Sequence, residues 1–169
     1  AADVVNFIRS SRRVRVSLVE ANVLDAGESI LLGNAEVTFS ASLRSPAAEQ
    51  EWGVLTPIAS LERGFGTAPQ QDFSPPEALS LDANLFDWFV APSEQSLALT
   101  LDVEELDWNF YYDVFENPNV SSSSVATLAF DLPVDTVGTQ RHTLTSTNVS
   151  VVVEVTVSEE RPGRNSRNR

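Results

Sequence analysis

Hydrophobic and polar residues alternate along most of the chain, and this pattern predicts β-strands almost everywhere. The clearest run places a valine at every second position from Val149 to Val157. Alternation with a period of two, in β-branched and aromatic residues, indicates strands with one buried face. The sequence therefore predicts eight strands, at residues 13–24, 30–44, 52–61, 79–90, 95–104, 106–116, 124–134 and 142–158.

Turn-forming residues separate several of these runs, for example at residues 25–28 and 135–138. Eight strands at this spacing predict an all-β fold, an eight-stranded antiparallel β-sandwich. The number of strands favours a single jelly roll over an immunoglobulin-like sandwich. We expect a basic N-terminal arm at residues 1–12, a jelly-roll domain at 13–158 and a basic flexible C-terminal tail at 159–169.

Charge is distributed very unevenly along the chain. The formal net charge is −13, and all 11 basic residues are arginines because lysine is absent. Eight of these arginines lie within the first 15 or the last nine residues, whereas 23 of the 24 acidic residues lie between Val16 and Glu160. The sequence thus combines an acidic body with two basic ends.

The composition also bears on the environment of the protein. Cysteine is absent, which excludes disulfides and thiol catalysis. An acid-rich sequence without lysine or cysteine is typical of salt-loving archaea, and at molar salt the Debye length of ~3 Å would screen the acidic body. The alternative is a GC-rich genome with ordinary acidic drift.

The sequence offers no catalytic constellation, so we expect neither enzymatic activity nor a cofactor. His142 is the single histidine, and its place near a strand start indicates an exposed residue rather than the base of a catalytic triad. A metal site with several histidine ligands is excluded. Asp102 and Glu104 would share one face of a strand, ~7 Å apart. We interpret them as part of a solvated acidic face, and predict no catalytic or metal-binding residues.

Several of these features together resemble a known family. The eight-strand pattern, the basic ends RSSRRVR and RPGRNSRNR, and the lysine-free acidic body look like the small single jelly-roll capsid proteins of icosahedral viruses. These viruses enclose an internal membrane and infect haloarchaea, with relatives among Thermus phages. The resemblance is architectural and spans residues 13–158. It implies a structural virion protein, a capsid subunit that assembles into an icosahedral shell over an internal membrane.

The same resemblance implies partners and a location. The partners would be copies of this chain and a second capsid protein, with no small-molecule substrate, and the location would be the virion. The basic ends are expected to contact anionic lipid or nucleic acid, where each arginine near the surface contributes ~1 kcal/mol. The residues predicted to contact this anionic surface are Arg9, Arg12, Arg13, Arg15, Arg161, Arg164, Arg167 and Arg169.

Two alternatives remain open from the sequence. The stretch FYYDVFENPNV is similar to the ENPN-type turn of desiccation-linked LEA/WHy stress-protective β-sandwich domains, although SSSS replaces the usual apolar residues after the turn. Dense aromatic residues and two glycosylation sequons instead fit a carbohydrate-binding or surface-layer module that is secreted or displayed at the cell surface.

Overall fold

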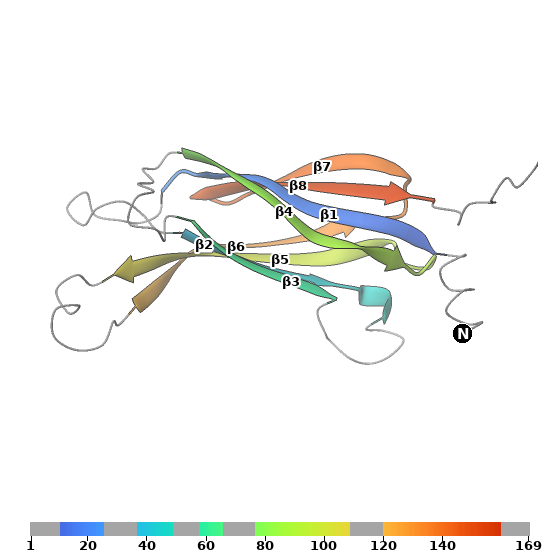
Figure 1. Ribbon diagram of the computed structural model, residues 1–169, viewed down its shortest axis with the longest axis horizontal. Helices are drawn as coiled ribbons and strands as arrows, with labels where there is room; N and C mark the ends of the chain where they lie inside the picture. Colours follow the sequence, from blue (N-terminus) through green and yellow to red (C-terminus); the bar gives the residue numbers. More distant parts are fainter. Residues whose placement is uncertain (1–10, 26–36, 49–57, 66–76, 109–119, 160–169) are drawn as a thin grey trace, which may run out of the picture.

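A computed structural model describes residues 11–25, 37–48, 58–65, 77–108 and 120–159. Within these residues the chain forms two four-stranded antiparallel sheets that stack as two layers (Figure 1). We call the sheet with the order β4-β1-β8-β7 sheet A, and the sheet with the order β3-β2-β5-β6 sheet B. The strands are β1 (Arg12–Val23), β2 (Val37–Arg44), β3 (Ala59–Phe65), β4 (Glu77–Val90), β5 (Ser96–Trp108), β6 (Val120–Pro133), β7 (Gly138–Thr145) and β8 (Val149–Ser158).

The core lies between the two sheets and follows directly from the alternation of the sequence. In β8 every second residue is buried, and in β2 the same pattern buries four of the eight residues. Most of the inward side chains are branched aliphatic residues, joined by several alanines and by Phe39, which is 1% exposed. Their removal from water supplies the main favourable free energy of folding, at about 25 cal/mol per Å² of apolar surface. The predicted eight-stranded antiparallel sandwich is confirmed.

Two strand assignments are wrong, although the described residues do form eight strands. Residues 95–104 and 106–116 were expected to form separate strands, but β5 runs without a break to Trp108 and pairs with β6 throughout. A register shift between Val103 and Glu104 accounts for the change in the alternation of apolar and polar residues at this point of the strand. A β-bulge of this kind bends a strand without ending it.

The predicted strand 142–158 is in fact the end of one strand and the whole of the next. The strands β7 and β8 pair with each other and are joined at residues 146–148. Ser146 makes this turn: its amide donates to the carbonyl of Val149, while its hydroxyl accepts from the amides of Asn148 and Val149. A serine turn lacks the glycine or proline that marks most turns in a sequence.

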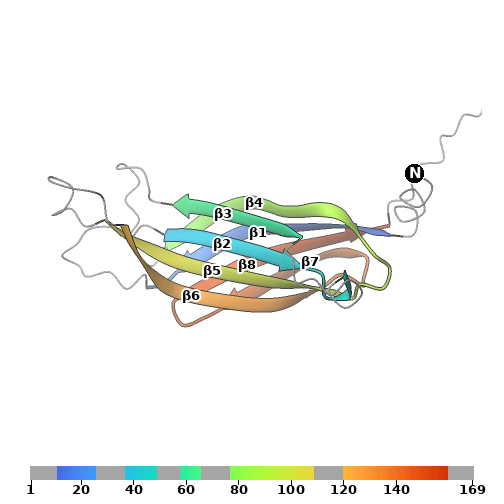
Figure 2. The same cartoon turned by 90° about the horizontal axis from the view of Figure 1, so that it is seen from below.

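The strand order also corrects the expectation of a jelly roll. In a jelly roll β7 and β8 lie in opposite sheets, whereas here they are neighbours in sheet A. The connection at residues 146–148 is a tight hairpin and keeps both strands in one layer, because opposite layers are separated by about 10 Å. Figure 2 shows the resulting order β3-β2-β5-β6 in sheet B.

The pairing of the first strand with the last brings the two ends of the domain together. The strands β1 and β8 are neighbours, and Arg13 pairs with Ser158, so the start of β1 and the end of β8 lie at the same end of the sandwich. We call this the terminal end. The turn 91–95 and residues 134–137 lie there too, because Arg12 bonds to both segments. The strand β1 begins at Arg12, inside the predicted arm, while residues 1–10 and 160–169 lie outside the described part of the chain.

Candidate anionic-surface contact at the terminal end

Arg12 ties three segments of the terminal end together. Its Nη1 donates to the carbonyl oxygen of Asp135 at 3.0 Å, and its Nη2 donates to the carbonyl oxygens of Pro92, at 3.4 Å, and Glu94. These bonds connect the start of β1 to the β4–β5 turn and to the segment between β6 and β7. The guanidinium of Arg12 therefore uses its donors on backbone carbonyl oxygens of the same chain.

Glu94 fixes the neighbouring turn from its other side. The residue is 3% exposed, and its carboxylate accepts hydrogen bonds from the hydroxyl of Ser45 and, at 3.4 Å, from the amide of Ala47. These hydrogen bonds fix the position of the Glu94 carboxylate beside the end of β2. Hydrogen bonds of Arg12 and Glu94 therefore hold the segments of the terminal end together.

Arg13 and Arg15 meet on a single carboxylate, that of Asp87. Arg13 donates from Nε to Oδ1 at 2.8 Å and from Nη2 to Oδ2 at 3.3 Å. Arg15 donates from Nε and Nη2 to Oδ2, at 3.2 and 3.1 Å. The register explains this arrangement: Arg15 lies directly opposite Asp87 across β1 and β4, and Arg13 lies two residues along on the same face.

The pKa of Asp87 is lowered from its ordinary value of 3.8. The largest cause is the hydrogen bond from Arg13, opposed in part by burial, with further lowering by the hydrogen bond from Arg15 and the charges of both arginines. The carboxylate is therefore ionised at neutral pH. Two guanidiniums and one carboxylate leave this cluster with a net charge of +1.

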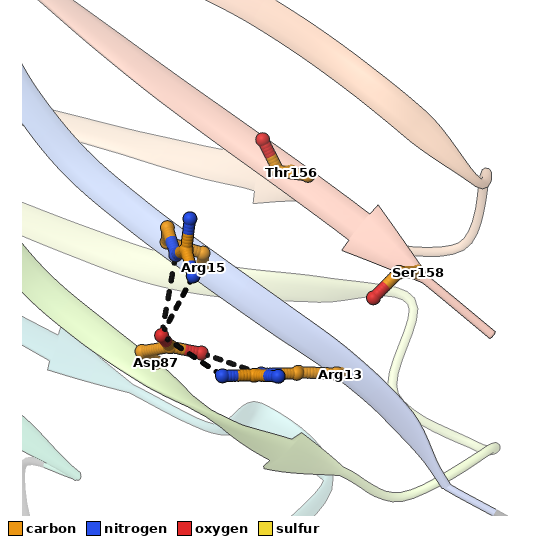
Figure 3. A pocket seen from close by; sticks show the side chains of 5 residues that line it. All are labelled: Arg13, Arg15, Asp87, Thr156 and Ser158. Atoms are coloured by element: carbon orange, nitrogen blue, oxygen red, sulfur yellow. Dashed lines mark hydrogen bonds and ion pairs between the residues drawn. The ribbon is translucent and has the colours of Figure 1, made fainter. Parts of the chain in front are cut away.

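A hollow of about 210 Å³ lies at this cluster, on the outer face of sheet A. Arg15 pairs with Thr156, and Arg13 with Ser158, so two hydroxyl side chains from β8 complete the lining. Figure 3 shows both arginine side chains extending from β1 toward Asp87 on β4, with Thr156 and Ser158 on the neighbouring strand. Five polar residues from three adjacent strands thus form one small surface; we call it the arginine hollow.

A second, larger hollow is apolar and lies along the last residues of β4. Its volume is about 510 Å³. Trp88 is 61% exposed, although the strand β4 places it opposite the buried Val14. Its ring meets that of Phe89 edge to face, with the centroids 5.6 Å apart. The apolar residues of this lining are Ala47, Ala48, Ile58, Phe86, Trp88, Phe89, Val90 and Ala91.

The structure places three of the eight predicted contact arginines. Arg13 and Arg15 share one outer face, and Arg12 turns instead toward the carbonyl oxygens that it binds. The other five, Arg9, Arg161, Arg164, Arg167 and Arg169, lie outside the described residues. The sequence analysis missed Asp87, Thr156 and Ser158, because only the pairing of β1 with β4 and β8 brings them to the arginines. It also missed the exposed ring of Trp88.

The remaining candidates from the sequence have simple surroundings. Asp102 accepts a hydrogen bond of 2.8 Å from the hydroxyl of Thr127, and Glu104 is exposed. The ring of His142 packs against that of Phe130, with the centroids 5.2 Å apart. Within the described ranges, no three histidine or carboxylate side chains are grouped so that they could bind a metal ion. In the same ranges, no helix is both long and apolar enough to cross a membrane.

Comparison with known proteins gives a fold and no family. No protein-family model matches the sequence, and no curated protein matches it either. The structure is similar to that of human GIVD cytosolic phospholipase A2 in complex with methyl gamma-linolenyl fluorophosphonate, with a TM-score of 0.50 and 13% identity. That match covers 89% of this chain and 17% of the phospholipase, so this chain spans only a small part of the enzyme.

A second similar structure is Drosophila C2-DSL-EGF1, with a TM-score of 0.51 and 10% identity over 87% of this chain and 67% of that one. The C2A domain of plant Extended Synaptotagmin 1 matches at a TM-score of 0.38 and 17% identity, over 86% of this chain and 93% of that domain. At such low identities these similarities concern the fold alone. The two matches with TM-scores of 0.50 and 0.51 agree with the two-sheet sandwich.

Proposed function

We propose that this protein is a structural, non-catalytic β-sandwich that docks its terminal end on an anionic membrane, as a subunit of a capsid shell laid over that membrane. The observation that carries the proposal is the pairing of Arg13 with Ser158. It puts the arginines of β1 at the end of the sandwich from which the chain continues toward Arg161. The start of β1 and the end of β8, each next to a basic stretch of the sequence, therefore lie at one end of the fold.

Trp88 favours lipid over nucleic acid as the anionic partner. Its exposed ring lines the apolar hollow at the end of β4, the strand that also carries Asp87 on its other face. Tryptophan combines an apolar ring with a polar N–H group, and this suits the boundary between lipid head groups and acyl chains. An exposed tryptophan at the same end of the sandwich as the arginines of β1 matches a surface that is charged outside and apolar beneath.

The shell part of the proposal explains how weak single contacts would suffice. Each exposed arginine contributes ~1 kcal/mol at an anionic membrane and is screened by salt. Many copies held in one shell would bind together by avidity. Copies of this chain and a second capsid protein are the proposed partners, the virion is the proposed location, and a salt-rich setting is proposed from the acidic, lysine-free composition.

Vesicle flotation tests the docking step. We expect the protein to float with vesicles that contain phosphatidylglycerol and to stay behind with pure phosphatidylcholine. The variant in which Arg161, Arg164 and Arg167 become glutamine should bind the acidic vesicles several-fold more weakly. Its matched control replaces Arg44, Arg63 and Arg141, which removes the same charge elsewhere. Equal binding by both variants, or binding to phosphatidylcholine as well, would contradict the docking proposal.

Two further readouts separate the parts of the proposal. If the protein binds duplex DNA more tightly than acidic vesicles, its anionic partner is nucleic acid and not lipid. Electron microscopy of protein-coated vesicles tests the shell: we expect an ordered lattice, formed with the second capsid protein if one is required. A coat without order, in the presence of all proteins of the particle, would reject the capsid function and leave membrane docking intact.

A further inference from the structure

The arginine hollow has a more specific chemistry than general attraction to a charged surface. We propose that it is a binding site for a phosphate group, carried either by a lipid head group or by a soluble phosphate ester. The lipid source rests on the function proposed above, whereas the phosphate chemistry rests on the hollow itself.

Hydrogen-bond donors surround the hollow on two sides. Arg13 and Arg15 project from the outer face of β1, and Ser158 and Thr156 lie directly across on β8. The two guanidiniums and the two hydroxyls line the same hollow, so they can contact one tetrahedral anion bound in it. Guanidinium groups bind phosphate oxygens in a bidentate fashion, and hydroxyl donors add to this.

Arg15 supplies the donor that is best placed for a ligand. Its Nε and Nη2 bind Asp87, whereas its Nη1 makes no hydrogen bond to any described residue, and the side chain is 56% exposed. The hydroxyl of Thr156 lies 3.0 Å from that of Thr139. If Thr139 donates in this contact, the proton of Thr156 points to another acceptor, and the hollow lies beside it.

Asp87 organises the site and is not its ligand-binding group. Two guanidiniums on one strand face would repel each other, and the shared carboxylate holds both in fixed positions. Its charge cancels one of the two positive charges and leaves +1 for an incoming anion. A net charge of +1 attracts an anion only modestly, so the site favours a compact anion that also accepts several hydrogen bonds.

The space is adequate for such a group. The volume of the hollow is about 210 Å³. This is roughly ten times the volume that a cavity needs to hold one water molecule. A comparison within sheet A makes the arrangement distinctive: Arg141 binds Glu154 at 2.7 Å as a simple one-to-one pair, and neither residue lines the arginine hollow. Arg141 therefore provides a matched control for Arg15.

Inorganic phosphate is the first probe. Titration of the full ¹⁵N-labelled chain at constant ionic strength, with chloride as the balancing anion, should give saturable NMR shifts at Arg15, Thr156 and Ser158. We expect Arg15→Gln to weaken phosphate binding about tenfold and Arg141→Gln to change it less than twofold, although both remove one positive charge. No saturable shift in the parent, or equal losses in the two variants, would overturn the site.

A nearly isosteric variant guards against a folding artefact. Thr156→Val removes one hydroxyl, keeps a β-branched residue in β8 and leaves both arginines on Asp87. We expect about threefold weaker phosphate binding with an unchanged circular dichroism spectrum. A well-folded Thr156→Val that binds phosphate like the parent would remove the hydroxyl side of the site and reject the convergent geometry.

Vesicles distinguish the two sources of phosphate. Phosphatidic acid presents a phosphate monoester and phosphatidylglycerol a diester, at surface charge made equal by composition. If Arg15→Gln reduces vesicle binding more than Arg141→Gln, with the larger difference on phosphatidic acid, the head group is the ligand. If only inorganic phosphate responds to Arg15→Gln, the site belongs to a soluble phosphate ester.

The same measurements keep this inference separate from the proposed function. Phosphate binding without any binding to acidic vesicles would reject membrane docking and support the phosphate site. Charge-dependent vesicle binding with no phosphate response at the hollow would support membrane docking and reject the phosphate site.

Discussion

The outer faces of the two sheets follow the same alternation but carry different chemistry. On sheet B the outward residues are small or acidic, and Thr127 bonds to Asp102 there. Arg44 is the one basic residue whose side chain is described on that sheet. On sheet A the outward residues include Arg13, Arg15 and the pair of Arg141 with Glu154. The inner faces of both sheets, by contrast, are mostly apolar, with Glu105 as a buried charged residue on β5.

This difference shows what the fold requires and what it leaves free. Burial of the inner residues holds both sheets together and determines which side of each strand faces outward. The chemistry of the outward residues is not determined by that burial, since sheet B is built equally well with threonine, alanine and aspartate. The concentration of arginine on one part of sheet A is therefore the feature that we connect with function.

The largest expected effect comes from the core that the two faces share. Leu101 on β5 is fully buried between the sheets. Leu101→Ala should lower the free energy of unfolding by about 2–5 kcal/mol, because it removes buried surface and leaves a cavity. The neighbouring Thr100→Ala, on the outer face of sheet B, should change it by less than about 0.5 kcal/mol. Urea denaturation measures both, and similar losses would show that the outer face also contributes to folding.

A smaller effect should separate the two faces by their response to salt. Asp102, Glu104 and Asp131 lie on β5 and β6 of sheet B, and none of them forms an ion pair with a described residue. The melting temperature should rise from dilute to molar salt as self-repulsion is screened. Conversion of these three residues to Asn, Gln and Asn should reduce that rise by a few degrees, since about 1 kcal/mol corresponds to about 2–4 °C for a chain of this size. A parent curve that stays flat would contradict the proposed adaptation to salt.

The inner face was easier to predict from the sequence than the outer one. Alternation identified the valines of β8 as core and eight strands as the total, because burial leaves a period of two in any strand. The division of residues 142–158 failed, since Ser146 turns the chain without glycine or proline. The meeting of Arg15 with Asp87 was also beyond the sequence. It depends on the register between β1 and β4, and two shifts interrupt that register.

Asp87→Asn should break the arginine cluster and leave the rest of sheet A intact. Two partly exposed arginines lose their shared carboxylate, so we expect a loss of about 1 kcal/mol at neutral pH. The effect depends on pH. Because the folded protein lowers the pKa of Asp87, its stabilising contribution is present above the unfolded value near 3.9 and is lost as the pH falls through the lower folded value.

The stabilities of parent and Asp87→Asn should therefore differ by a constant amount above about pH 5 and converge below about pH 4. Denaturation curves across this range provide the measurement. Asp131→Asn, on the outer face of sheet B, is the matched control and should show no such convergence from an arginine partner. A difference for Asp87→Asn that persists in acid would mean that the carboxylate acts through packing and not through its charge.

The smallest effect is expected at the second ion pair of sheet A, and it sharpens the contrast with the arginine hollow. Arg141 and Glu154 lie opposite each other on β7 and β8, and the arginine side chain is 66% exposed. An exposed one-to-one pair contributes little, because water and salt screen it and both side chains lose conformational freedom. A double-mutant cycle with Arg141→Gln and Glu154→Gln should give a coupling of less than about 0.5 kcal/mol, vanishing in molar salt.

The corresponding cycle between Arg13 and Asp87 should give a larger coupling that is less sensitive to salt, since that carboxylate is only 21% exposed and accepts hydrogen bonds from two arginines. Equal couplings would mean that the arginine hollow is an ordinary cross-strand ion pair, and its distinct role would then depend on the phosphate titration alone.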